Sequence, residues 1–281
     1  MLPNDTHIGR VRLQVADLPR SLAFYCDLLG FQQTGSTSGM AQLSAGADQA
    51  VRIELLERRG AQPKSTRTAG LYHVAIRVPD RAALGMLLQR LLQANYPLQG
   101  GADHLVSEAI YLADPDGNGV ELYRDRPRTD WPWHGDTVQM SSDPLDAAGI
   151  MRDAAEAGMS WQGIHPQTDI GHVHLQVSDL AQAERFFSKL LGLEVTQRSY
   201  PGALFMAAGG YHHHVGANIW SSRGASPAPE TAAGLSFFEL AIPDEASRQQ
   251  ALQRLEAAGV ALERHESQML ASSPDGIRVL L

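Results

Sequence analysis

The feature that most constrains the fold of this 281-residue chain is an internal repeat. The segment THIGRVRLQVADL, which begins at Thr6, matches TDIGHVHLQVSDL, which begins at Thr168, at nine of thirteen positions and at an offset of 162 residues (168 − 6). Self-similarity at a fixed offset is the signature of an architecture built from copies of one unit. The two halves of the chain therefore share one fold.

Each half divides again into two similar units. GLYHVAIRVPD, from Gly70, and GLSFFELAIPD, from Gly234, repeat a pattern in which a strand with alternating apolar residues is followed by Asp. In the first and third units the next segment has the apolar spacing of a helix and stops at Gly30 or Gly192, residues suited to end a helix. Strands punctuated by Gly, Pro and Asp close each unit. The sequence predicts an α+β fold of four βαβββ modules.

The repeat lapses in one internal stretch. We expect an N-terminal domain over residues 1–126 (modules one and two), a linker over 127–167 and a C-terminal domain over 168–281 (modules three and four). The linker holds clustered Trp, Pro and Ser residues and is expected to pack on the domains.

Composition excludes several partners. The net charge of −8 argues against binding to nucleic acid or an anionic membrane, because both need clustered Lys and Arg. The sequence lacks a stretch of about 18 apolar residues, the length that crosses a bilayer, and its N-terminus lacks a signal-peptide pattern. We therefore expect a cytoplasmic protein whose partners are small molecules.

Two histidines occupy the same register position in separate modules. Seven residues before the module's Asp stand His73 in module two and His172 in module three. Modules one and four carry Arg10 and Phe237 at that position, and we expect Arg10 to pair with Glu54 across strands.

A carboxylate completes the pattern in one of these modules. Glu121 stands in the expected last strand of module two, 48 residues after His73 (121 − 73). His73, His172 and Glu121 together form a set of two histidines and one carboxylate, which leaves open positions on a metal and suits non-heme Fe(II). Mn(II), whose ligand preferences overlap, remains an alternative.

These modules and residues resemble the vicinal oxygen chelate superfamily, which includes glyoxalase I, bleomycin-resistance proteins and extradiol dioxygenases, and most closely its four-module catechol 2,3-dioxygenases. The resemblance implies two curved half-open barrel domains with a metal held by first and last strands. Two-domain extradiol enzymes carry the site on modules three and four, whereas here module four has Phe237 and Leu280 at the ligand positions. Convergence of the ligands therefore requires module two to pair with module three, within the chain or across a dimer.

The resemblance also implies catalytic residues. His213, in GGYHHHVGAN, matches a catalytic histidine of the family, and strand alternation would point it away from His212 and His214, which remain alternatives. Tyr111, ten residues before the ligand glutamate, matches a substrate-contacting tyrosine, and His104 resembles a histidine that supports it.

The predicted function is extradiol ring cleavage, in which O2 is inserted into a catechol-type diol at Fe(II). One alternative is a glyoxalase-like metal-dependent isomerase or lyase, which usually places two carboxylates on its metal. Another is a metal-free, ligand-sequestering protein of the bleomycin-resistance kind. The expected partners are a catechol and O2, and we expect a homo-oligomer.

Overall fold

The computed structural model describes residues 1–158 and 160–281; residue 159, which falls in the predicted linker, lies outside the described residues. Most strands form two large sheets, in agreement with the predicted α+β class. The first sheet has eight strands. In spatial order they are β17 (Leu262–His265), β18 (Gln268–Ser272), β19 (Arg278–Leu280), β16 (Gly234–Ala241), β1 (His7–Val15), β4 (Val51–Glu57), β3 (Met40–Ser44) and β2 (Gln32–Thr37).

The second sheet has nine strands and carries the candidate site. In spatial order they are β11 (Asp143–Pro144), β6 (Leu98–Asp103), β7 (Ser107–Ala113), β8 (Gly119–Asp125), β5 (Gly70–Val78), β12 (Asp169–Gln176), β15 (Val215–Asn218), β14 (Ala203–Ala207) and β13 (Glu194–Gln197).

The helices begin at the aspartate that recurs after each module's first strand. Asp17, Asp80, Asp179 and Asp244 each accept a hydrogen bond from a backbone N–H in the first turn, as helix N-caps do. In modules one and three a short α-helix continues as a π-helix of six or seven residues. The helical segments are α1 (Leu18–Leu22), η1 (Ala23–Leu28), α2 (Arg81–Gln93), η2 (Arg128–Asp130), α3 (Ala147–Glu156), α4 (Leu180–Ala183), η3 (Glu184–Leu190) and α5 (Glu245–Ala257). Every helix of the described chain is too short or too polar to span a bilayer.

The modules pair across the two halves of the chain. β5 of module two pairs antiparallel with β12 of module three, and β1 of module one pairs with β16 of module four. The pairing of module two with module three is thus confirmed and occurs within one chain. Each sheet takes one module from 1–126 and one from 168–281, so the sheets do not follow the division predicted from the repeat.

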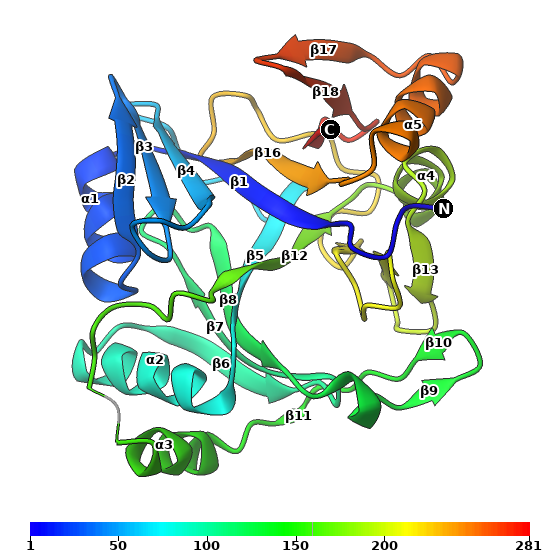
Figure 1. Cartoon of the computed structure of the whole chain (residues 1–281). Helices are drawn as coiled ribbons and strands as arrows, with labels where there is room; N and C mark the ends of the chain where they lie inside the picture. The colour runs from blue at the N-terminus through cyan, green and yellow to red at the C-terminus, as the bar shows by residue number, and fades with distance from the viewer. Residues whose placement is uncertain (159) are drawn as a thin grey trace.

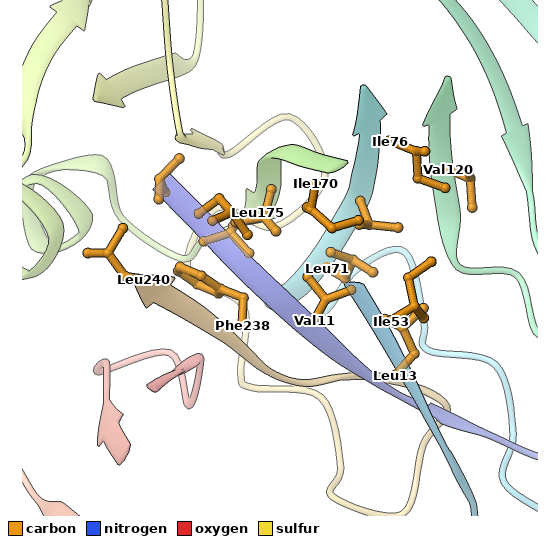
Figure 2. Packing of buried hydrophobic residues seen from close by; sticks show 14 of the residues in the cluster. Val11, Leu13, Ile53, Leu71, Ile76, Val120, Ile170, Leu175, Phe238 and Leu240 are labelled. Atoms are coloured by element: carbon orange, nitrogen blue, oxygen red, sulfur yellow. The ribbon is translucent and has the colours of Figure 1, made fainter. Parts of the chain in front are cut away.

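The main core lies between the two sheets, where β1 and β12 face each other (Figure 1). Figure 2 shows side chains of both sheets meeting there. Val11 and Phe238 come from the first sheet, Leu71 and Ile170 from the second, and all four are at most 4% exposed. Because strand residues alternate between faces, burial of these positions turns their neighbours to the opposite face of each sheet. The second sheet presents its histidines on that face.

The first sheet uses the equivalent face for an ion cluster. Glu54 is fully buried and binds Arg10 at 3.0 Å and Arg12 at 2.7 Å. The predicted pairing of Arg10 with Glu54 is confirmed. Arg12 also lies over the Phe237 ring, with 4.6 Å to its centroid. In modules one and four, therefore, an internal salt bridge occupies the position that holds histidines in modules two and three.

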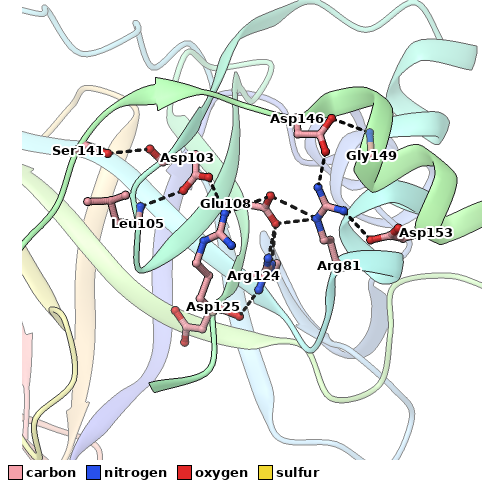
Figure 3. A network of polar contacts seen from close by, with 11 residues as sticks. Arg81, Asp103, Leu105, Glu108, Arg124, Asp125, Ser141, Asp146, Gly149 and Asp153 are labelled. Atoms are coloured by element: carbon pink, nitrogen blue, oxygen red, sulfur yellow. Dashed lines mark hydrogen bonds and ion pairs between the residues drawn. The ribbon is translucent and has the colours of Figure 1, made fainter. Parts of the chain in front are cut away.

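The linker is ordered where it is described. β9 (Trp133–His134) and β10 (Thr137–Val138) form a hairpin, and β11 pairs with β6. Figure 3 shows how its helix is attached: Arg81 of α2 binds Asp153 at 2.7 Å and Asp146 at 2.9 Å, both from the linker. Arg81 also binds the buried Glu108 of β7, which Arg124 neutralises from the other side. This network fixes the linker to module two.

Candidate active site

Three adjacent strands of the second sheet bring the predicted metal ligands together. In the order β8, β5, β12, Glu121 lies opposite Ala75, and Ala75 lies opposite His172. His73 stands two residues before Ala75 on β5 and therefore shares its face. The small Ala75 side chain leaves room between the carboxylate and the imidazole, so all three functional groups point to one spot.

The ligand atoms are close enough for one cation. Glu121 Oε2 lies 2.8 Å from His73 Nε2 and 3.1 Å from His172 Nε2, and one ligand atom from each residue lies within 4.8 Å of the others. All three side chains are buried. Although His73 Nε2 is buried and close to Glu121 Oε2, the angle of this contact is unsuitable for a hydrogen bond, and the atom has no hydrogen-bond partner within the described chain. Since a buried polar atom without a partner costs free energy, this donor set fits a divalent cation.

The electrostatics favour the ligating form of His172. Burial lowers the pKa of the His172 imidazole to about 4, although the Glu121 carboxylate pulls it upward. His172 is therefore neutral at pH 7, which is the charge state of a ligating imidazole. Metal binding requires neutral imidazoles and deprotonated carboxyls, so the centre is prepared for a cation before one arrives.

Tyr111 and His104 lie at the edge of this centre. Tyr111 of β7 faces Glu121 across the strand pair. His104 Nδ1 lies 2.5 Å from the backbone oxygen of Ser141, which can only accept a hydrogen bond. His104 therefore carries its ring hydrogen on Nδ1. The other ring nitrogen, Nε2, accepts a hydrogen bond from the Tyr111 hydroxyl at 2.6 Å. Burial raises the pKa of Tyr111 well above its usual value, and the charge of Glu121 adds to this. Tyr111 is a neutral phenol whose oxygen lone pairs remain available.

The three consecutive histidines have separate environments. His213 lines the same cavity as the proposed ligands, and its ring centroid is 4.1 Å from that of His172. His212 is fully buried and lies 2.9 Å from Asp125, whereas His214 stacks on Tyr211. The alternation argument does not apply here, because β15 begins only at Val215 and the His212 and His213 rings contact each other at 2.7 Å.

His214 is buried in its neutral form, and we therefore expect the free energy of unfolding to decrease at acidic pH. Its Nδ1 accepts a hydrogen bond from the Ala208 N–H, and burial lowers its pKa to about 3. The unfolded state takes up this proton below about pH 6.5, its ordinary pKa, whereas the folded state does not until about pH 3. Stability therefore falls as pH drops through this window, by up to ~1.4 kcal/mol per pH unit for this group.

His214→Asn removes this titration and offers an amide oxygen to the Ala208 N–H. We expect the difference in unfolding free energy between pH 7 and pH 5, measured with urea, to shrink by up to ~2 kcal/mol. His134→Asn, a change at an exposed position of β9, is the matched control. An unchanged pH dependence in His214→Asn would show that His214 does not cause the acid sensitivity.

The cavity above the centre has a volume of about 370 Å³. Besides the residues already described, its walls include apolar and aromatic side chains: Tyr72, Val106, Met140, Tyr200, Phe205 and Trp220. His174, the register neighbour of His73, also lines it. Among the described residues that line it, Glu121 is the only carboxylate and none is Lys or Arg.

Sequence reasoning missed two contributions to this site. The linker supplies Met140, Ser141 and Ser142 to the cavity wall, and no motif marked them. Asp125, which binds His212, was also overlooked. It lies four residues after Glu121 on one strand and thus on the same face, which is the signal that could have found it.

A curved sheet of paired βαβββ modules, with two histidines and one carboxylate converging in a cavity at the joint, defines a metal-binding protein of the vicinal oxygen chelate class. The chain belongs to the Glyoxalase/Bleomycin resistance protein/Dioxygenase superfamily, whose sequence profile matches residues 7–122 and 169–279.

Known proteins agree with this assignment. The chain is 40% identical over 275 residues to the catechol-2,3-dioxygenase of Bacillus subtilis (strain 168), covering 96% of this chain and 94% of that protein. A solved structure from Bacillus subtilis subsp. subtilis str. 168 superposes with a TM-score of 0.69 at 12% identity, covering 99% of this chain and 85% of the other. Glyoxalase I from Zea mays gives 0.60 at 17% identity, covering 99% and 92%. The two structural likenesses establish the fold, which enzymes of different chemistry share.

Proposed function

We propose that this chain is an extradiol ring-cleaving dioxygenase that inserts O2 into a catechol at a non-heme Fe(II) centre held by His73, Glu121 and His172. The observation that carries the proposal is the convergence of these three side chains in a buried cavity. Two neutral imidazoles and one carboxylate leave open positions for reactants and suit Fe(II), while Mn(II) has overlapping preferences. The near full-length relative named catechol-2,3-dioxygenase supports the same reaction.

The donor set weighs against the other members of the superfamily. A glyoxalase-like metal centre usually has two carboxylates, and among the described residues lining the cavity Glu121 is the only one. A protein that merely sequesters a ligand has no need for three buried, converging metal ligands. The first alternative thus lacks a ligand among these residues, and the second leaves the ligand set without a purpose.

The residues of the chain have distinct proposed roles. Bound Fe(II) would bind both catechol and O2 and would allow electron transfer between them. His213 would accept a proton from a catechol hydroxyl as the diol binds, and Tyr111 would receive a hydrogen bond from the other hydroxyl; both line the cavity, which supports these roles. His104 fixes the direction of the Tyr111 hydroxyl hydrogen. The aromatic walls would pack against the catechol ring and hold it in one orientation.

The wall composition predicts which catechols are accepted. A substrate carboxylate would be buried with no Lys or Arg among the lining residues to pair with it, and an unpaired buried charge is costly. We expect kcat/KM for 4-methylcatechol to exceed that for 3,4-dihydroxybenzoate by about 100-fold or more, equivalent to ~2.7 kcal/mol. Oxygen uptake with both compounds at one pH measures this ratio. Equal values would mean that the substituent lies outside the cavity.

The reaction itself is tested by adding catechol in air to chain reconstituted anaerobically with Fe(II). We expect oxygen consumption together with a yellow, ring-opened product, and neither in the metal-free chain. Catechol that binds without oxygen uptake would favour a sequestering protein. Turnover of the hemithioacetal of a thiol and a 2-oxoaldehyde, again without oxygen uptake, would favour a glyoxalase-like isomerase.

A further inference from the structure

A partly buried carboxylate close to the cavity is not used by the reaction as described so far. Asp125, at the end of β8, accepts hydrogen bonds from Arg77 at 3.0 Å, from the Tyr211 hydroxyl at 2.9 Å and from His212 Nε2 at 2.9 Å. It comes from module two, whereas His212 and Tyr211 come from module three. The cluster therefore crosses the same joint as the proposed metal ligands.

The direction of each hydrogen bond follows from what the atoms can do. An ionised carboxylate only accepts, and the Arg77 guanidinium beside Asp125 favours its ionised form, so His212 must carry a hydrogen on Nε2. A neutral imidazole has one ring hydrogen, which leaves His212 Nδ1 as an acceptor. His213 Nδ1, 2.7 Å away, must then donate. The single hydrogen of a neutral His213 is thus used on the side away from the cavity.

The opposite direction would require His212 to be a cation. Asp125 already has a cationic partner in Arg77. A neutral His212 satisfies both of its ring nitrogens and leaves Arg77 as the cation that Asp125 binds.

The remaining nitrogen of His213 faces the cavity. His213 is among the lining residues, and within the described chain its Nε2 makes no hydrogen bond. In this tautomer Nε2 has a free lone pair, so it can accept a proton but cannot donate one. The contacts of His212 with Asp125 and with His213 determine which nitrogen of His213 carries the hydrogen. A His213 ring without these contacts could carry it on either nitrogen.

We propose that Asp125 and His212 are positioning residues that hold His213 with Nδ1 protonated and Nε2 open to the cavity, ready to take the proton of a substrate hydroxyl. In that step the O–H bond breaks, the N–H bond forms at Nε2 and the electron pair stays on the substrate oxygen, so no redox partner is required. The catalytic use rests on the proposed function, whereas the tautomer of His213 does not.

The tautomer is measured directly by nitrogen-15 NMR of the histidine rings in the full-length, metal-free chain. The His213 signals are assigned as those absent from His213→Asn. We expect Nδ1 of His213 to be protonated and Nε2 to be unprotonated, and His212 to show the reverse. A protonated Nε2 on His213 would overturn the proposal, whether or not the chain oxidises catechol.

Two matched variants test the use of this arrangement in turnover. His212→Asn and His212→Leu both lose the contact with Asp125, but Asn can still present an oxygen to the His213 Nδ1–H. We expect His212→Leu to lower kcat by about 10- to 100-fold, the usual effect of removing a group that orients a functional histidine, with KM nearly unchanged. The decrease in log kcat for His212→Asn should be at most half of the decrease for His212→Leu.

Iron content equal to that of the unaltered chain shows that either variant is folded. Equal losses of kcat in both variants, or a rise in KM without a loss of kcat, would contradict the positioning role. An unaltered chain that takes up no oxygen with any catechol would instead reject the proposed function, and the NMR result would still decide the tautomer.

Discussion

Glu121→Gln is expected to lose its metal and nearly all activity. The carboxylate is the only anionic member of the proposed ligand set, and its replacement leaves a neutral amide between two imidazoles. Loss of a residue that merely supports a ligand already weakens metal affinity about 10- to 100-fold, so loss of a ligand should weaken it by more than about 100-fold. Iron per chain after gel filtration, and oxygen uptake with catechol, measure the two effects.

The control for this variant is Glu263→Gln, which changes an exposed carboxylate of β17 whose partner is Arg278 on the surface. It should keep both iron and activity. If Glu121→Gln also retained one tightly held iron per chain, Glu121 would not be a ligand, and the centre would have to be rebuilt from other residues.

His213→Phe is expected to keep its metal and lose turnover. Phenylalanine fills the same space between the Phe205 and His172 rings, so the proposed ligands stay in place. It cannot take a proton, and general acid–base catalysis by one side chain contributes about 10²- to 10⁴-fold. We therefore expect kcat to fall by a factor in that range at unchanged iron content.

The matched control is His134→Phe in the β9–β10 hairpin, where the side chain is exposed. Normal turnover by His213→Phe would assign proton transfer to another group. His174 would then be the next candidate, because it also lines the cavity and its Nε2 has no partner within the described chain.

The ligand positions could be predicted because the repeat fixes a register. Each module's aspartate caps its helix, and the residue seven positions earlier falls on the same face of the first strand in every copy. Counting from Asp80 and Asp179 therefore located His73 and His172 without a structure. The absence of ligands from module four then required the pairing that β5 and β12 display.

The assembly of the sheets could not be read from the repeat alone. All four first strands alternate in the same way, and alternation shows which face is buried but not which copy lies alongside. The polar faces provide the missing information: Arg12 lies next to Glu54 and Phe237 in one sheet, as His174 lies next to His73 in the other. The contacts of Arg12 with Phe237 and of His174 with His73 join residues more than a hundred positions apart, in different modules.

The surroundings of the site were also beyond sequence reasoning. Ser141 orients His104 through a backbone oxygen, which any residue would supply equally well. Asp125 and His212 meet only because two modules join. Side chains that act through such long-range contacts have no characteristic sequence separation that could reveal them. Ligands on repeated strands do have one, because each stands at a fixed position in its module.

The most direct test of the central claim is anomalous diffraction at the iron absorption edge from crystals of the chain loaded with Fe(II) without oxygen. We expect one strong peak per chain, within bonding distance of His73 Nε2, His172 Nε2 and a carboxylate oxygen of Glu121. A peak bound by other residues, or no peak in a chain that cleaves catechol, would contradict the central claim.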